Sequence, residues 1–173
     1  MRMQESKQTS WLQRLLVGGN IKFTLARIIC LVVFAFLLIK YVMIPVRCEG
    51  LSMEPNYPDH SIHLVYKLAY WNSKPQRGDV VAIAVRETQK LLLMKRIIGL
   101  PGEKISIQSG VVYVDGEPLD EPWVQKNRFP WNRKEVELRA DEYLVIGDNR
   151  SMPMHQHELG EVNIKRIQGK IIK

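Results

Sequence analysis

The longest hydrophobic run of the chain extends without interruption from Ile28 to Ile39, with Lys40 next and YVMIPV continuing it to Val46. The 19 residues from Ile28 to Val46 are close to the roughly 20 residues that cross a bilayer as a helix. A lysine near a helix end extends its ammonium group to the headgroups, and Pro45 is expected to end the helix. The pattern predicts a single transmembrane segment over residues 28–46.

A cleaved signal peptide is the alternative interpretation of this run. Such a peptide has an apolar region of about 7–15 residues followed by a cleavage site with small residues. Bulky residues follow Ile39, and the sequence shows no small-x-small site there. The pattern therefore favours an uncleaved signal anchor.

Beyond the anchor, short apolar stretches alternate with turn residues, a pattern typical of β-strands. The sequence predicts strands over 61–66, 79–85, 91–98, 104–108, 111–114 and 142–146. Residues 113–141 are predicted to form a hairpin with an excursion. Many short strands with frequent turns predict a mostly β chain, in which residues 47–173 form a compact sandwich or barrel-like domain.

The charge distribution changes the interpretation of a net charge of +7. Residues 1–27 hold five basic residues and one acidic residue, whereas residues 47–173 hold 19 basic and 17 acidic residues. The surplus before the anchor predicts a cytoplasmic basic tail over residues 1–27 and an extracytoplasmic domain over 47–173. It is not the distribution of a nucleic-acid-binding surface, so no nucleic-acid partner is expected.

Ser52 lies in the segment Gly50-Leu51-Ser52-Met53-Glu54-Pro55, a few residues past the anchor. A serine hydroxyl is a weak nucleophile and needs an adjacent base. Gly50 is expected to permit a close backbone approach, and Pro55 to restrict the chain that follows. Taken alone, the segment is more typical of a solvated loop serine than of a nucleophile.

Lys95 is the candidate base, because apolar residues flank it in LLLMKRIIG. A lysine acts as a base near neutral pH when its pKa falls by about three units, or about 4 kcal/mol, and burial in an apolar site can do this. The next residue, Arg96, points to the opposite face of a regular strand. Taken alone, Lys95 fits better as an edge-strand lysine that opposes aggregation.

The run Gly147-Asp148-Asn149-Arg150 follows a predicted strand and is expected to form a turn. Asp148 is predicted to pair with Arg96, and Arg150 to support the site structurally. His155 and His157 are two residues apart, and a metal there would need a third ligand such as Glu158 or Glu161, so no metal site is predicted.

These motifs together resemble those of the bacterial type I signal peptidases, a family of membrane-anchored serine–lysine endopeptidases. The matching runs are GLSMEP, RGDVV, MKRIIGLPGE, VVYVDGEPL and IGDNR, in this order after an anchor. The resemblance implies that Ser52 is the nucleophile and Lys95 the general base. The supporting residues are then Gly50, Met53, Pro55, Arg96, Asp148, Asn149, Arg150, Ser151 and His155.

The sequence departs from the family pattern after Arg150. Pro153 stands where the family has a serine that orients the lysine, and Ser151 is the candidate replacement. His155 and His157 stand where a supporting Asp/Arg pair is expected. Gly50 has no hydroxyl to offer an oxyanion, so the backbone N–H of Ser52 is expected to take more of that role.

The resemblance implies a membrane-bound serine endopeptidase that cleaves N-terminal signal peptides, with small residues at the cleavage site, from secretory preproteins. It implies no cofactor, and its partners are preproteins and membrane lipid. A narrower alternative is a peptidase dedicated to one pilin or secretion system. A different alternative is a catalytically impaired anchored β domain that binds preproteins or another peptidase.

Overall fold

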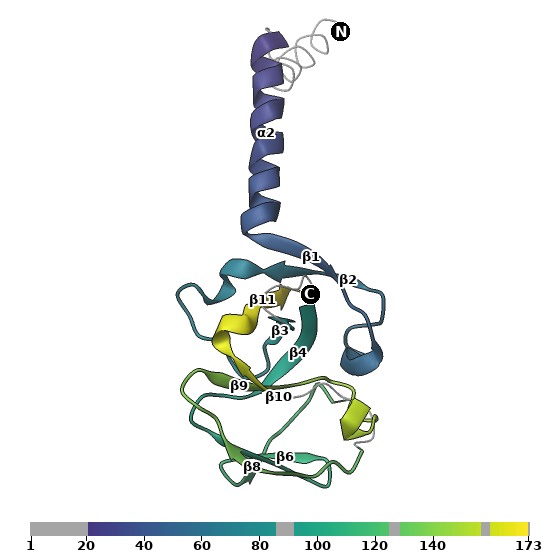
Figure 1. Ribbon diagram of the computed structural model, residues 1–173. Coiled ribbons are helices and arrows are strands. Elements are labelled where there is room, and N and C mark those ends of the chain that lie inside the picture. The colour runs from purple at the N-terminus through teal and green to yellow at the C-terminus, as the bar shows by residue number, and fades with distance from the viewer. Residues whose placement is uncertain (1–20, 86–91, 125–128, 157–159, 173) are drawn as a thin grey trace, which may run out of the picture. The chain divides into compact units, whose positions relative to one another are not determined.

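The computed structural model describes residues 21–85, 92–124, 129–156 and 160–172. The chain divides into a unit that ends at Val42 and a second unit that begins at Met43. It is mostly β with one N-terminal apolar helix, as the hydrophobic pattern predicts (Figure 1).

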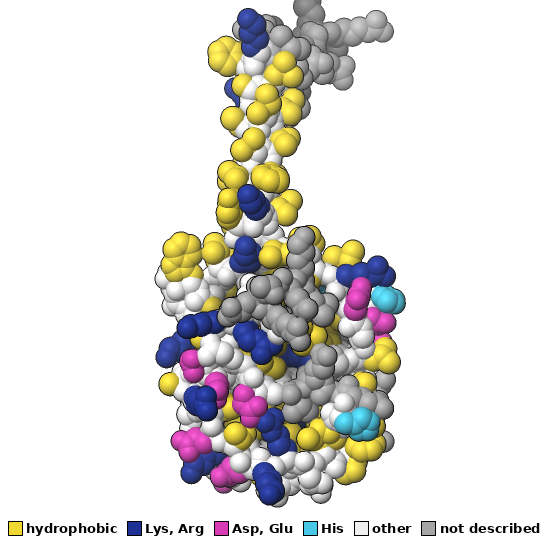
Figure 2. Space-filling model, viewed as in Figure 1, with side chains coloured by type: hydrophobic (Ala, Val, Ile, Leu, Met, Phe, Trp, Pro, Cys, Tyr) yellow, Lys and Arg dark blue, Asp and Glu magenta, His cyan; other side chains and the backbone are white. Residues whose placement is uncertain are grey.

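Helix α2 comprises Ile21–Tyr41, and its Lys22–Tyr41 segment is long and apolar enough to cross a membrane. Apolar side chains are visible along its whole length in Figure 2. Lys40 Nζ lies 5.8 Å from the ring centroid of Phe36 and 5.2 Å from that of Tyr41. The charged group within the hydrophobic stretch 28–46 is therefore close to two aromatic rings.

The predicted segment 28–46 is displaced from the helix at both ends. The helix begins at Ile21, and Met43–Arg47 forms strand β1, which pairs with β2, Ile62–Tyr66. Pro45 is tolerated in β1 because this strand is at the edge of its sheet. Hydrophobicity continues from helix to strand, which is why the sequence pattern does not mark the boundary.

The larger sheet has seven antiparallel strands in the order β1-β2-β11-β3-β4-β9-β10. Its central strand β3, Val80–Ala84, is buried at every residue, which explains its continuous apolar sequence. The remaining strands are β4, Leu92–Gly99; β9, Glu142–Ile146; β10, Gly160–Asn163; and β11, Ile167–Ile172. Short 3₁₀ turns connect them at Leu51–Met53, Lys67–Tyr70, Met154–Gln156 and Ile164–Arg166.

The smaller sheet has four strands in the order β7-β6-β5-β8. They are β5, Lys104–Gln108; β6, Val111–Val114; β7, Glu117–Pro118; and β8, Arg133–Glu137. The predicted hairpin is present as β6 and β7, which pair antiparallel. Residues 113–141 are more than an excursion, because β8 returns to pair with β5.

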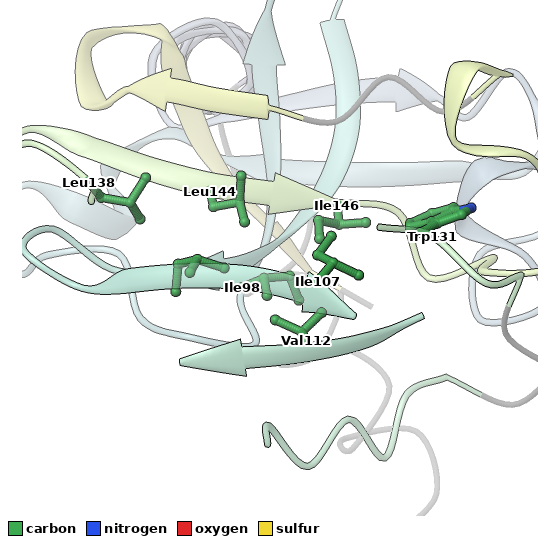
Figure 3. Close-up of a cluster of buried hydrophobic side chains, with 8 residues drawn as sticks. Ile98, Ile107, Val112, Trp131, Leu138, Leu144 and Ile146 are labelled. Carbon is green, nitrogen blue, oxygen red and sulfur yellow. The ribbon is translucent and has the colours of Figure 1, made fainter. Parts of the chain in front are cut away.

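A buried apolar cluster joins the two sheets (Figure 3). The larger sheet contributes Ile98, Leu144 and Ile146, and the smaller one contributes Ile105, Ile107 and Val112. A Cβ on Gly99 would lie 2.7 Å from Leu138 Cδ1, 2.9 Å from Ile105 Cγ1 and 3.0 Å from Leu144 Cβ, so a larger residue would crowd three core side chains. A second cluster, which includes Met53, Tyr57, Val65 and Ile171, lies under the turn that carries Ser52.

Candidate active site

Ser52 and Lys95 lie side by side although they are 43 residues apart in sequence. Lys95 Nζ is 2.8 Å from Ser52 Oγ, within hydrogen-bonding distance. Lys95 is on β4 and only 4% exposed, and Ser52 is in the 3₁₀ turn Leu51–Met53. The next residue, Met53, is 1% exposed and anchors this turn in the core. The turn therefore holds a hydroxyl against a buried amine.

A cleft of about 690 Å³ contains this pair. Its walls are largely apolar and come from strands β1, β3, β4 and β11 and from the residues around the turn. The apolar lining includes Ile44, Val46, Cys48, Ala82, Leu92, Met94, Met152 and Ile171. A cleft of this size with mostly apolar walls and a few polar groups is typical of a ligand-binding site.

The thiol of Cys48 shares the cleft with Ser52. Burial, with a smaller contribution from the charge of Asp59, raises the pKa of Cys48. The charge of Lys95 lowers the pKa of Cys48, but this effect is smaller than that of burial. The raised pKa keeps the thiol neutral near pH 7, so Cys48 is a poor competitor of Ser52 as a nucleophile.

Arg96 points to the other face of β4 and forms the predicted ion pair with Asp148. Its Nε donates to Asp148 Oδ1 at 2.7 Å and its Nη2 to Oδ2 at 2.5 Å. Asn56 Nδ2 donates to the same carboxylate at 2.9 Å, and the guanidinium lies 4.8 Å from the Trp123 ring centroid. The pair locks the start of the 148–151 turn to the strand that carries Lys95.

Asn149 connects this turn directly to the serine turn. Its backbone N–H donates to Ser52 O at 2.9 Å, and its Nδ2 donates to Leu51 O at 3.0 Å. The hydroxyl of Ser151 donates to Asn149 Oδ1 at 2.6 Å. The hydroxyl proton of Ser151 is therefore directed to Asn149, and the orientation of Lys95 by Ser151 stays a prediction.

Arg150 supports the same turn from inside the domain. Its guanidinium forms an ion pair with Glu121, its Nε donates to Gly147 O at 3.0 Å, and it lies 5.6 Å from the Trp131 ring centroid. Arg150 is 1% exposed and Glu121 is 3% exposed. The role of Arg150 in the structure is thus to fix the backbone after Asn149.

Gly50 has a backbone reason for being glycine, and close approach is not that reason. Its φ is +98°, a backbone angle that residues other than glycine rarely adopt. A Cβ at this position would meet nothing within 4 Å. The Gly50 N–H donates to Asp59 Oδ1 at 2.8 Å. Pro55 is exposed and follows a cis peptide bond after Glu54.

Asp59 holds the chain just before Ser52, and the sequence reasoning missed it. The hydrogen bond from the Gly50 amide is the main cause that lowers the pKa of Asp59, and the His60 amide at 2.9 Å adds to it. A carboxyl group whose pKa is lower in the folded than in the unfolded chain stabilises the fold at pH values above its unfolded pKa, near 3.9. This contribution is lost as the pH falls through the pKa of the folded state.

We expect Asp59→Asn to be less stable than the wild type above about pH 5, with the difference shrinking below about pH 3.5 as the wild-type carboxyl is protonated. Denaturant unfolding of the detergent-solubilised protein across this pH range measures the difference. Glu135→Gln, at an exposed carboxylate of β8, is the control. A difference between wild type and Asp59→Asn that stays constant with pH would contradict the prediction.

His155 is not among the described residues that line the Ser52–Lys95 cleft, and its supporting role stays a prediction. It is exposed and lines a separate pocket of about 540 Å³ with Phe129, Trp131, Pro153 and Met154. Trp131 Nε1 donates to Met152 O at 2.7 Å, which directs the following segment toward this pocket. His157 lies outside the described residues. Within the described ranges, no group of three or more His, Cys, Asp or Glu side chains could hold a metal ion.

Three supporting residues have no signal in the sequence: Asn56, Asp59 and Glu121. Asn56 and Asp148 are 92 positions apart, and Glu121 and Arg150 are 29 apart. Their partners are set by the tertiary fold, and neither spacing nor residue type marks them in advance.

This chain is similar to several known proteins. A crystal structure of signal peptidase I from Enterococcus faecalis V583 aligns with 58% of this chain and 98% of that chain, at 24% identity and a TM-score of 0.44. The signal peptidase I of Bacillus licheniformis is 33% identical over 152 residues, which are 82% of this chain and 81% of the relative.

Signal peptidase I T of Bacillus subtilis (strain 168) is 32% identical over 152 residues, covering 82% of this chain and 78% of the relative. The family model for signal peptidase, peptidase S26, matches residues 21–172. The chain therefore belongs to the signal peptidase family, peptidase S26.

Proposed function

We propose that this protein is a membrane-bound serine endopeptidase that cleaves signal peptides from secretory preproteins, with Ser52 as nucleophile and Lys95 as general base. The observation that carries the proposal is the 2.8 Å contact between Lys95 Nζ and Ser52 Oγ inside an apolar cleft. Membership of the peptidase S26 family supports the reaction class.

Burial is what suits Lys95 to this role. A lysine that is 4% exposed sits where desolvation disfavours the ammonium form, the direction that a general base requires. The neutral amine accepts the proton of Ser52 Oγ–H while Oγ attacks the scissile carbonyl carbon. The carbonyl π electrons move to its oxygen, which gives the tetrahedral oxyanion.

The oxyanion needs donors that already point toward it. The amide of Ser52 lies in the first turn of the 3₁₀ segment Leu51–Met53, where N–H groups lack intrahelical acceptors. Gly50 has no hydroxyl, and its N–H is bonded to Asp59. We therefore assign the main oxyanion contact to Ser52 N–H.

Collapse of the tetrahedral intermediate breaks the C–N bond, and the Lys95 ammonium protonates the leaving amine. The signal peptide is then an ester on Ser52 Oγ. Lys95, neutral again, takes a proton from a water molecule whose oxygen attacks the ester carbonyl, and the Ser52 hydroxyl is regenerated. The cycle needs no metal or organic cofactor.

The substrates and the anchor follow from the same proposal. Preproteins with small residues at the cleavage site enter the cleft, and α2 keeps the enzyme in the lipid bilayer. We propose that residues before α2 are cytoplasmic and that the β domain is extracytoplasmic, since basic residues accumulate before the helix.

We expect protease added to intact spheroplasts to digest the β domain and spare the N-terminal tail. The positive-inside rule gives the direction of insertion. An epitope tag at each end, followed by immunoblotting before and after lysis, measures it. Protection of the β domain until lysis would reverse the orientation.

Cleavage of a membrane-bound preprotein by the purified full-length protein tests the function. We expect two products, with the new N-terminus after a small residue, as mass spectrometry determines. Ser52→Ala is the matched control. Binding of the preprotein with no cleavage by the wild type would favour instead an impaired, preprotein-binding member of the family.

A further inference from the structure

We propose that Ser151 is a positioning residue, which fixes the side-chain amide of Asn149 and thereby the backbone of the turn that carries Ser52. The inference rests on the proposed function and assigns a role to a residue in the part of the chain where the family pattern is altered. Ser151 acts through Asn149, to which both its hydroxyl and its backbone N–H donate.

The first step is the contact between Asn149 and the serine turn. Asn149 donates two hydrogen bonds to consecutive carbonyls, from Nδ2 to Leu51 O at 3.0 Å and from its backbone N–H to Ser52 O at 2.9 Å. Asn149 is only 6% exposed, so bulk water is a poor substitute for either bond. Leu51 O belongs to the same peptide unit as the Ser52 N–H, the proposed oxyanion donor, and Ser52 O belongs to the next peptide unit.

The second step is the orientation of the Asn149 amide. Only the NH₂ end of this group can donate to Leu51 O, because a flipped amide would place two acceptor oxygens against each other. Ser151 decides between the orientations, since its Oγ and its N–H both donate to Asn149 Oδ1, at 2.6 and 3.2 Å. Two donors at one end of the amide direct its donor end to Leu51.

The third step is that the rest of the turn is already fixed. Asp148, on one side of Asn149, forms the bidentate pair with Arg96, and Arg150, on the other side, is paired with Glu121. The backbone of Asn149 is thus held from both sides by ion pairs. The side-chain amide retains a rotational choice, and Ser151 is the residue that determines it.

Ser151→Ala removes the Oγ donor and keeps the N–H donor, so it tests this role with little change in volume. We expect kcat for preprotein cleavage to fall about two- to tenfold, as the loss of one hydrogen bond implies, with KM nearly unchanged. Ser151→Thr retains a hydroxyl on the same carbon and should restore most of kcat. Asn149→Asp replaces the Nδ2 donor by an acceptor facing Leu51 O and should cost more than Ser151→Ala.

Ser73→Ala is the matched control, because the Ser73 hydroxyl also donates to a residue close in sequence, Ala69 O at 2.8 Å, but at an exposed position outside the site. Its kcat should equal that of the wild type. Equal kcat values for Ser151→Ala and wild type would overturn the inference. A loss in Ser151→Thr as large as that in Ser151→Ala would also overturn it.

Amide hydrogen exchange provides a readout that does not depend on cleavage. The Asn149 N–H that donates to Ser52 O should exchange faster in Ser151→Ala than in the wild type and in Ser73→Ala. Unchanged exchange there would refute the positioning role. If the wild type fails to cleave preproteins but the exchange rate responds as expected, the proposed function fails and the Ser151–Asn149 contact to the turn stands.

Discussion

Lys95→Ala, Lys95→Arg and Ser52→Ala are each expected to lower kcat/KM for preprotein cleavage on the order of a thousandfold or more, as loss of a nucleophile or its base does in other serine hydrolases. Ser52→Ala removes the atom that attacks, and Lys95→Ala removes the amine 2.8 Å from it. Lys95→Arg keeps the positive charge, but a guanidinium does not release its proton near neutral pH. The charge-conserving change should therefore fail as fully as the alanine change.

Single-turnover cleavage with the detergent-solubilised full chain measures this loss. Circular dichroism should show that each variant is folded, and Lys134→Ala, at an exposed lysine of β8, should keep wild-type activity. Double substitution at Ser52 and Lys95 should cost no more than either single change, because the two groups act as one unit. Substantial activity in purified Ser52→Ala or Lys95→Arg would refute the proposed dyad.

Arg150→Ala is expected to cost about 3–5 kcal/mol of unfolding free energy, the usual penalty for breaking a buried ion pair. Arg150 and Glu121 are 1% and 3% exposed, and removing the guanidinium takes the counter-charge from a carboxylate that water hardly reaches. Arg150 Nε also donates to Gly147 O, so the turn next to Asn149 loses a second contact. Denaturant unfolding of the solubilised protein measures the difference.

Replacing both Arg150 and Glu121 should lower the free energy of unfolding less than replacing Arg150 alone. We expect the double variant Arg150→Met with Glu121→Leu to recover much of the lost stability, since no buried charge then remains at this site. Arg139→Ala is the comparison, because Arg139 is 82% exposed in its 3.6 Å pair with Glu142 and should contribute only about 0–1 kcal/mol. A small loss in Arg150→Ala, comparable to that in Arg139→Ala, would contradict the expectation.

The sequence predicted strands correctly where turn residues lie at both ends of a short apolar run. Predicted strands 104–108, 111–114 and 142–146 coincide with β5, β6 and β9. β1 was missed because its apolar residues continue the run of α2, and only pairing with β2 separates them. β8 was missed because Arg133–Glu137 is mostly charged, and its strand character comes from pairing with β5.

The candidate site divides in the same way. The motifs around Ser52 and Lys95, and the opposite charges of Arg96 and Asp148, are local in sequence and were predicted from it. The orientation of Ser151 was not, because its bonds to Asn149 Oδ1 depend on how the 148–151 turn folds. The path of residues 152–155 was not predicted either, and Trp131 Nε1 donates to Met152 O there. That path also carries His155 to the pocket beside Phe129.

By itself, the sequence determined an apolar helix, a mostly β domain and two runs with the residue types of a serine–lysine peptidase, because periodicity and motifs are properties of neighbouring residues. Only the tertiary structure decided which side chains meet. The pairing of β3 with β4 and β11, and the burial of Met53, place Ser52 Oγ beside Lys95 Nζ across 43 residues. Asn56, Asp59 and Glu121 acquire their roles in the same way, since each depends on a partner that only the folded chain brings within hydrogen-bonding distance.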